Sequence, residues 1–158
     1  MNRAHLLAGT VLLVAACGGS AQPGATVPTS APAKLPPALV FPMAGVGAAN
    51  RLVAGTVTIQ KTADGSGFKN TIDVEGLEPN SLHVYHIHKG SCANNGPIVT
   101  PLPNPLRADA AGHATAINDI ASPYQGTGFY ANVHAGPDLS SAANAAPCAC
   151  ADLADTAA

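Results

Sequence analysis

The clearest pattern in this chain is a series of short segments in which apolar and polar residues alternate, as they do in half-buried β-strands. Turn-forming residues such as Ala63-Asp64-Gly65-Ser66-Gly67 separate the segments. The segments are 52–59, 68–74, 83–88, 106–117 (interrupted at 110–112) and 129–134. Beyond the first residues no helical periodicity of useful length appears. The pattern predicts an all-β fold, an antiparallel sandwich or barrel.

One stretch departs from this alternation. Residues 90–104 carry prolines at 97, 101 and 103, and the pattern predicts an irregular segment there. Loops of this length are uncommon unless they serve a site. Cys92 lies near the start of the segment, where a covalent anchor would hold it.

The N-terminus has the pattern of a removable export signal over residues 1–16. Arg3 supplies a basic start, and the apolar stretch Leu6–Ala15 is shorter than the roughly 20 residues that a membrane-spanning helix needs. Two small residues stand directly before Cys17, which is the arrangement that a lipoprotein signal peptidase uses. We therefore expect Cys17 to be lipidated; an ordinary signal peptide with an incidental cysteine is the alternative.

Residues 17–37 are predicted to be a tether, because they are rich in Pro, Ser, Thr and Ala and cannot form a core. A Pro-rich chain of this kind extends about 3.1 Å per residue. The predicted β domain is then 38–158. Together these segments indicate an extracytoplasmic protein, anchored by lipid to a bacterial membrane.

The composition excludes nucleic-acid binding as the function. The net charge is −2 and 10% of the residues are charged, so there is no basic stripe to bind nucleic acid.

The cysteine count predicts one disulfide. If Cys17 carries lipid, Cys92, Cys148 and Cys150 remain, which is an odd number. In an oxidising compartment this predicts one disulfide and one leftover thiol.

The candidate metal-binding side chains are histidines. His86 and His88 are two residues apart in a predicted strand and therefore share a face. Imidazole suits copper or zinc, and His134, at the end of another predicted strand, would complete a set of three nitrogen ligands. The alternative is that a His-x-His pair merely lies on the surface or forms hydrogen bonds.

Several motifs together resemble copper/zinc superoxide dismutases. His83-Val84-Tyr85-His86-Ile87-His88 is similar to that family's copper-binding strand, and Gly76-Leu77-Glu78-Pro79-Asn80 is similar to the turn before it. The segments 90–92, 104–105, 108–114, 130–138 and 149–153 resemble further family motifs in the same order.

The resemblance implies a Greek-key β-sandwich or barrel of that type. It implies one copper ion, with His86, His88 and His134 as its ligands, and His83 as a histidine that ties neighbouring loops behind the site. It also implies a disulfide between Cys92 and Cys150, with Cys148 as the competing partner.

The sequence departs from that family's pattern at two places. Between Cys92 and Arg107 there is no histidine and no acid, so a zinc site is not expected, and His113 is only a weak candidate ligand. Residues 138–149 lack the basic residue that attracts superoxide in the family.

Three functions follow as expectations. The first is a copper enzyme that converts superoxide to dioxygen and hydrogen peroxide. The second is a protein that binds copper for buffering or delivery, without turnover. The third is a structural β domain without metal. The expected partners are therefore superoxide or copper, and a membrane through the N-terminal lipid.

Overall fold

The computed structural model describes residues 33–156 of the chain. The predicted signal peptide (1–16), Cys17 and most of the predicted tether lie outside this part. In chain order the elements are β1 (Leu39–Gly45), the short 3-10 helix η1 (Ala48–Asn50), β2 (Ala54–Lys61), β3 (Phe68–Glu75), β4 (Leu82–His83), β5 (Tyr85–Lys89), β6 (Ile98–Pro101), β7 (Leu106–Arg107), β8 (Ala114–Ile120), β9 (Phe129–His134), α1 (Ala142–Ala145) and β10 (Pro147–Asp152).

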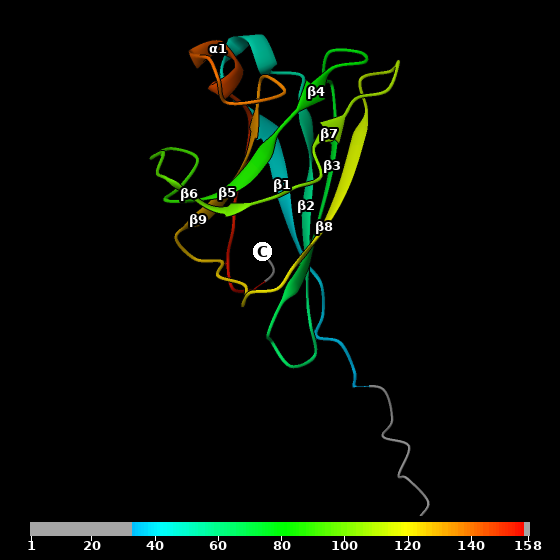
Figure 1. The fold of residues 1–158 in the computed structure, drawn as a ribbon, viewed down its shortest axis with the longest axis vertical. Coiled ribbons are helices and arrows are strands. Elements are labelled where there is room, and N and C mark those ends of the chain that lie inside the picture. Colours follow the sequence, from blue (N-terminus) through cyan, green and yellow to red (C-terminus); the bar gives the residue numbers. More distant parts are fainter. Residues whose placement is uncertain (1–32, 157–158) are drawn as a thin grey trace, which may run out of the picture. The chain divides into compact units, whose positions relative to one another are not determined.

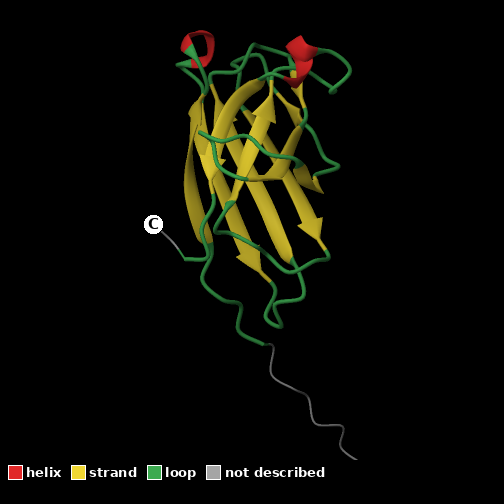
Figure 2. Ribbon diagram, turned by 90° about the vertical axis from the view of Figure 1, so that its left-hand side faces the viewer, coloured by secondary structure: helices red, strands yellow, loops and turns green. Residues whose placement is uncertain are grey.

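Eight of the strands form one antiparallel sheet in the order β6-β5-β9-β10-β1-β2-β3-β8, and β4 pairs with β7 beside it. The sheet curls around a common interior (Figures 1 and 2). Because β3 pairs with β8 and β5 pairs with β9, the chain crosses between distant strands as in a Greek key. This confirms the predicted all-β antiparallel class.

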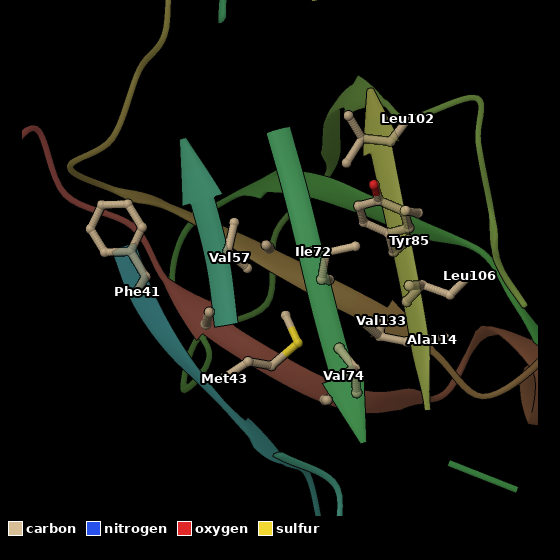
Figure 3. Close-up of a cluster of buried hydrophobic side chains, with 14 of the residues drawn as sticks. Phe41, Met43, Val57, Ile72, Val74, Tyr85, Leu102, Leu106, Ala114 and Val133 are labelled. Carbon is tan, nitrogen blue, oxygen red and sulfur yellow. The ribbon is translucent and has the colours of Figure 1, made fainter. Parts of the chain in front are cut away.

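The alternation in the sequence decides which side chains fill the interior. In β2, Val57 and Ile59 are fully buried, while Thr56 and Thr58, which alternate with them, are not. In β3, Ile72 and Val74 are fully buried in the same way. Figure 3 shows Val57, Ile72 and Val74 in one cluster with Tyr85 and Val133 from the opposite strands. A core of small aliphatic residues agrees with the scarcity of aromatics.

The alternating pattern did not predict two of the strands, β1 and β10. The β1 segment contains Pro42, and β10 consists mainly of alanine and cysteine, so neither has the β-branched composition that marks a strand. They pair with each other and lie between β2 and β9, so that their tertiary partners decide their conformation. The segment predicted to be irregular also contains the short edge strand β6.

A buried polar network connects the interior to the segment between β6 and β7. Asn118 donates to the hydroxyl of Tyr85, which donates to Oδ1 of Asn70 at 3.3 Å. The Oδ1 of Asn118 accepts from the backbone N–H of Asn104 at 2.9 Å. Because Tyr85 directly precedes His86, this network holds the start of β5, the strand that carries two of the candidate ligands.

Candidate metal centre

Two neighbouring strands bring the three predicted ligands to one face of the sheet. β5 carries His86 and His88, and β9 ends at His134. The strands are antiparallel, with His86 opposite Asn132 and His88 opposite Tyr130. Side chains that face each other across a strand pair project from the same side of the sheet. His134, two residues beyond Asn132, therefore shares the face of His86 and His88, which lies opposite to the core.

The three imidazoles are close enough to share one ion. The ring centroids of His86 and His134 are 5.3 Å apart, those of His88 and His134 5.5 Å, and those of His86 and His88 6.1 Å. One nitrogen from each ring lies within 4.8 Å of the nitrogens from the other two. His88 and His134 are buried and His86 is half-buried.

Backbone carbonyls decide which nitrogen of two rings faces the centre. His88 Nδ1 lies 2.9 Å from the carbonyl oxygen of Gly96, and His134 Nδ1 lies 2.8 Å from that of Ala145. A carbonyl oxygen only accepts, so both Nδ1 atoms carry the hydrogen and both Nε2 atoms keep a free lone pair. Within the described residues, His88 Nε2, His134 Nε2 and His86 Nδ1 are buried without a hydrogen-bond partner.

The three unpartnered atoms are one per ring, and they belong to the three residues that cluster. Buried polar atoms are normally hydrogen-bonded, so three unpartnered nitrogens on three clustered rings call for a ligand. A metal ion that prefers imidazole nitrogen satisfies all three at once. The residues present therefore fit a bound metal ion.

The charge state of the site suits a cation. Burial, and after it the nearby His134 and His88, lower the pKa of His86 to about 4. Burial also lowers the pKa of His134. At neutral pH these rings are therefore uncharged, with lone pairs available to a metal.

His83 contacts the backbone of His134 and not the three clustered rings. Its ring is buried, with Nδ1 2.8 Å from the carbonyl oxygen of His134 and Nε2 2.7 Å from the hydroxyl of Ser81. The Nδ1–H group of His83 donates to that carbonyl, because the oxygen only accepts. His83 therefore holds the backbone of a candidate ligand without facing the centre.

A disulfide anchors the start of the segment whose Gly96 carbonyl contacts His88. Cys92 and Cys150 are bonded, with their Cα atoms 5.8 Å apart. The backbone N–H of Cys92 also donates to Asp152 at 2.7 Å. Cys150 lies opposite Asn132 in the β9–β10 pair and therefore on the same face as the histidines. Cys148 remains a free thiol in the hydrophobic core.

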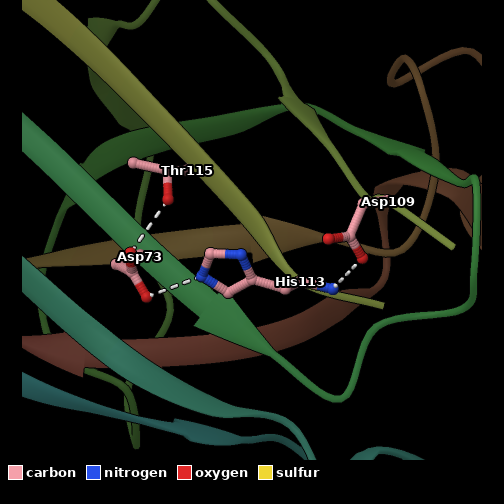
Figure 4. Close-up of polar contacts among 4 residues, drawn as sticks. All are labelled: Asp73, Asp109, His113 and Thr115. Carbon is pink, nitrogen blue, oxygen red and sulfur yellow. Dashed lines mark hydrogen bonds and ion pairs between the residues drawn. The ribbon is translucent and has the colours of Figure 1, made fainter. Parts of the chain in front are cut away.

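His113 takes no part in the cluster. Figure 4 shows its ring beside Asp73, with a nitrogen–oxygen distance of 3.1 Å, while Thr115 donates to the other carboxylate oxygen. Its backbone N–H donates to Asp109. The histidine thus joins β3 to the start of β8 at the surface.

Sequence reasoning missed four residues that contact or stand opposite the clustered histidines. Asn132 and Tyr130 stand two and four positions before His134, so the strand period alone would have placed them on its face. The carbonyls of Gly96 and Ala145 leave no signal, because every residue type has a carbonyl. Only the folded loops show which carbonyls meet the imidazoles.

Comparison with known proteins gives a distant structural likeness. The solved structure of Cu/Zn superoxide dismutase from Brucella abortus matches with a TM-score of 0.54 and 20% sequence identity, covering 75% of this chain and 100% of that chain. At this identity the likeness concerns the fold. No curated protein matches the sequence.

The sequence resemblance to copper/zinc superoxide dismutases assigned the wrong family. The family model that matches is that of the CHRD domain, over residues 32–136. The motifs behind the resemblance were mostly turns and alternating strands, and a shared fold places such features in the same order. His86, His88 and His134 all lie inside the matched segment. Because this match covers more than half of the chain, the protein belongs to the CHRD-domain family.

Proposed function

We propose that this protein binds one copper ion through His86 Nδ1, His88 Nε2 and His134 Nε2. The observation that carries the proposal is the convergence of three buried, unpartnered imidazole nitrogens. Two of them are aimed by carbonyls from separate loops, which is the outer support that metal-bound histidines usually have.

The choice of copper rests on the donor set. The cluster contains imidazoles and no carboxylate. For nitrogen ligands the affinity of divalent metals peaks at Cu²⁺, above Zn²⁺. Bound copper would supply a one-electron couple; the three rings would hold it, and the half-buried His86 marks the side nearest to solvent.

Copper titration of the metal-free domain, residues 38–158, tests this function. We expect one ion per chain by calorimetry, and Zn²⁺ should be displaced by an equivalent of Cu²⁺. The electron paramagnetic resonance spectrum should show hyperfine coupling to nitrogen. Binding without saturation at one ion, or a spectrum without nitrogen coupling, would remove the proposal.

Superoxide dismutation is the second candidate function. Two observations support it. His86 is half-buried, so one side of the cluster lies near solvent, and the structural neighbour is named a Cu/Zn superoxide dismutase. The reaction converts two superoxide anions and two protons to dioxygen and hydrogen peroxide. The segments that flank the centre, 90–104 and 135–146, contain no basic residue and one acid, Asp138.

This charge pattern predicts slow turnover. Focusing by basic residues raises the association rates of anions by roughly 10- to 1,000-fold, and it falls steeply with salt. The copper-loaded protein should therefore consume superoxide at a rate that changes little with ionic strength. Stopped-flow measurement of superoxide decay checks both points. A rate no greater than that of free copper would leave binding alone as the function.

We propose further that the domain is exported and held at a membrane by lipid on Cys17. The signal-like N-terminus supports this, and the Cys92–Cys150 disulfide suits an oxidising compartment. Among the described residues no helix is long and apolar enough to span a bilayer. Mass analysis of the mature N-terminus would identify a lipid on Cys17.

A further inference from the structure

We propose that Tyr130 is a positioning residue for the metal centre, which fixes the imidazole of His88 through stacking and through Gly96. The inference rests on the proposed metal-binding function. It assigns a role to a side chain that touches a candidate ligand but offers no atom to the metal itself.

The first contact is between the two rings. Tyr130 stands directly opposite His88 in the β5–β9 pair. Their centroids are 5.0 Å apart and their planes differ by 27°, so the phenol ring stacks on the imidazole. Tyr130 is 1% exposed, so its ring cannot swing away into solvent. The stack therefore restricts the ring orientation of His88.

The second contact runs through Gly96. The backbone N–H of Gly96 donates to the Tyr130 hydroxyl at 3.3 Å, and the Gly96 carbonyl accepts from His88 Nδ1 at 2.9 Å. Gly96 has no side chain that could anchor it to neighbouring residues. A Cβ atom there would collide with the backbone carbonyl of Lys89. The phenol hydroxyl therefore helps to place the carbonyl that orients His88.

Tyr130 adds to anchors that hold the segment on both sides of Gly96. The segment after β5 is fastened at Cys92 by the disulfide and by the bond to Asp152. Cys92 lies four residues before Gly96, and on the other side the backbone N–H of Lys89 donates to the carbonyl of Pro97 at 2.9 Å. At Gly96 itself, within the described residues, the side chains of Tyr130 and His88 form the hydrogen bonds to its N–H and carbonyl groups. Without the hydroxyl, the Gly96 carbonyl would have a wider range of positions, and His88 Nδ1–H would lose its fixed acceptor.

The test compares Tyr130→Phe with Tyr124→Phe. Tyr124 is the matched control, because its hydroxyl also forms one hydrogen bond with the backbone, to the carbonyl of Ala154 at 2.9 Å, and it is outside the histidine cluster. Each variant removes one hydroxyl and keeps the ring. Tyr130→Ala, which also removes the stack, is measured where its circular dichroism shows that it folds.

The first measurement uses the metal-free protein. Long-range nitrogen NMR spectra of the imidazoles report the tautomer of His88. The wild type should show hydrogen on Nδ1, and Tyr130→Phe should show a mixture of tautomers or a broadened signal. Tyr124→Phe should match the wild type. This arm does not require metal to bind, so it separates failure of the positioning role from failure of the metal site.

The second measurement is copper affinity together with the copper resonance spectrum. Tyr130→Phe should weaken binding by about 2- to 12-fold, as expected for one net hydrogen bond. Tyr130→Ala should weaken it by about 10- to 100-fold, as for the loss of an outer support of a ligand. Both variants should alter the nitrogen hyperfine pattern. If Tyr130→Phe leaves the His88 tautomer, the affinity and the spectrum unchanged, the positioning role is wrong.

Discussion

Replacing His134 by alanine should reduce copper affinity by at least about 100-fold. Loss of a group that merely supports a metal ligand costs roughly 10- to 100-fold, and His134 would be a ligand itself. The two imidazoles that remain come from one strand, with ring centroids 6.1 Å apart, and would have no donor opposite them. Competition with a copper chelator of known affinity measures the change.

The matched control for this variant is His113→Ala. It removes one imidazole from the surface, where the ring bonds Asp73 on β3. Copper affinity should stay within a factor of two of the wild type. Circular dichroism and thermal unfolding of both variants show whether the fold persists. Equal affinities for His134→Ala and His113→Ala, in folded proteins, would mean that copper does not use the cluster.

Removing the disulfide with Cys92→Ser and Cys150→Ser should have the second largest effect. The bond joins residues separated by 58 positions. Closing a loop of this length stabilises the folded state by about 4 kcal/mol in the chain-entropy model. Denaturant unfolding of the metal-free domain should therefore show a lower midpoint, with a slope that rises because the unfolded chain is less compact without the bond. Copper affinity should fall as well, since the anchored segment supplies the Gly96 carbonyl to His88.

The control for the disulfide is Cys148→Ala. This change removes a buried thiol from the core but leaves the bond between Cys92 and Cys150 intact. Its stability loss should be smaller, because only one sulfur atom leaves the interior, and copper affinity should be unchanged. If the double serine variant unfolds at the same denaturant concentration as the wild type, the disulfide does not stabilise this fold.

The strands that carry the site could be predicted because alternation is a local property. A side chain's face depends only on whether its position in the strand is odd or even. That rule places His86 and His88 together, and it buries Val57, Ile59, Ile72 and Val74. It failed for β1 and β10, where proline, alanine and cysteine give no clear alternation and neighbouring strands decide the conformation. It also could not distinguish a CHRD domain from a superoxide dismutase of similar fold.

By itself, then, the sequence determined the all-β class, the shared face of two histidines and the candidacy of a third. Tertiary structure alone decided which nitrogens are free, because the carbonyls that select them belong to residues 8 and 11 positions away along folded loops. It also placed Tyr130 against His88 and left Cys148 in the core. These outcomes depend on strand register and loop closure, which are long-range properties that no local pattern of residues records.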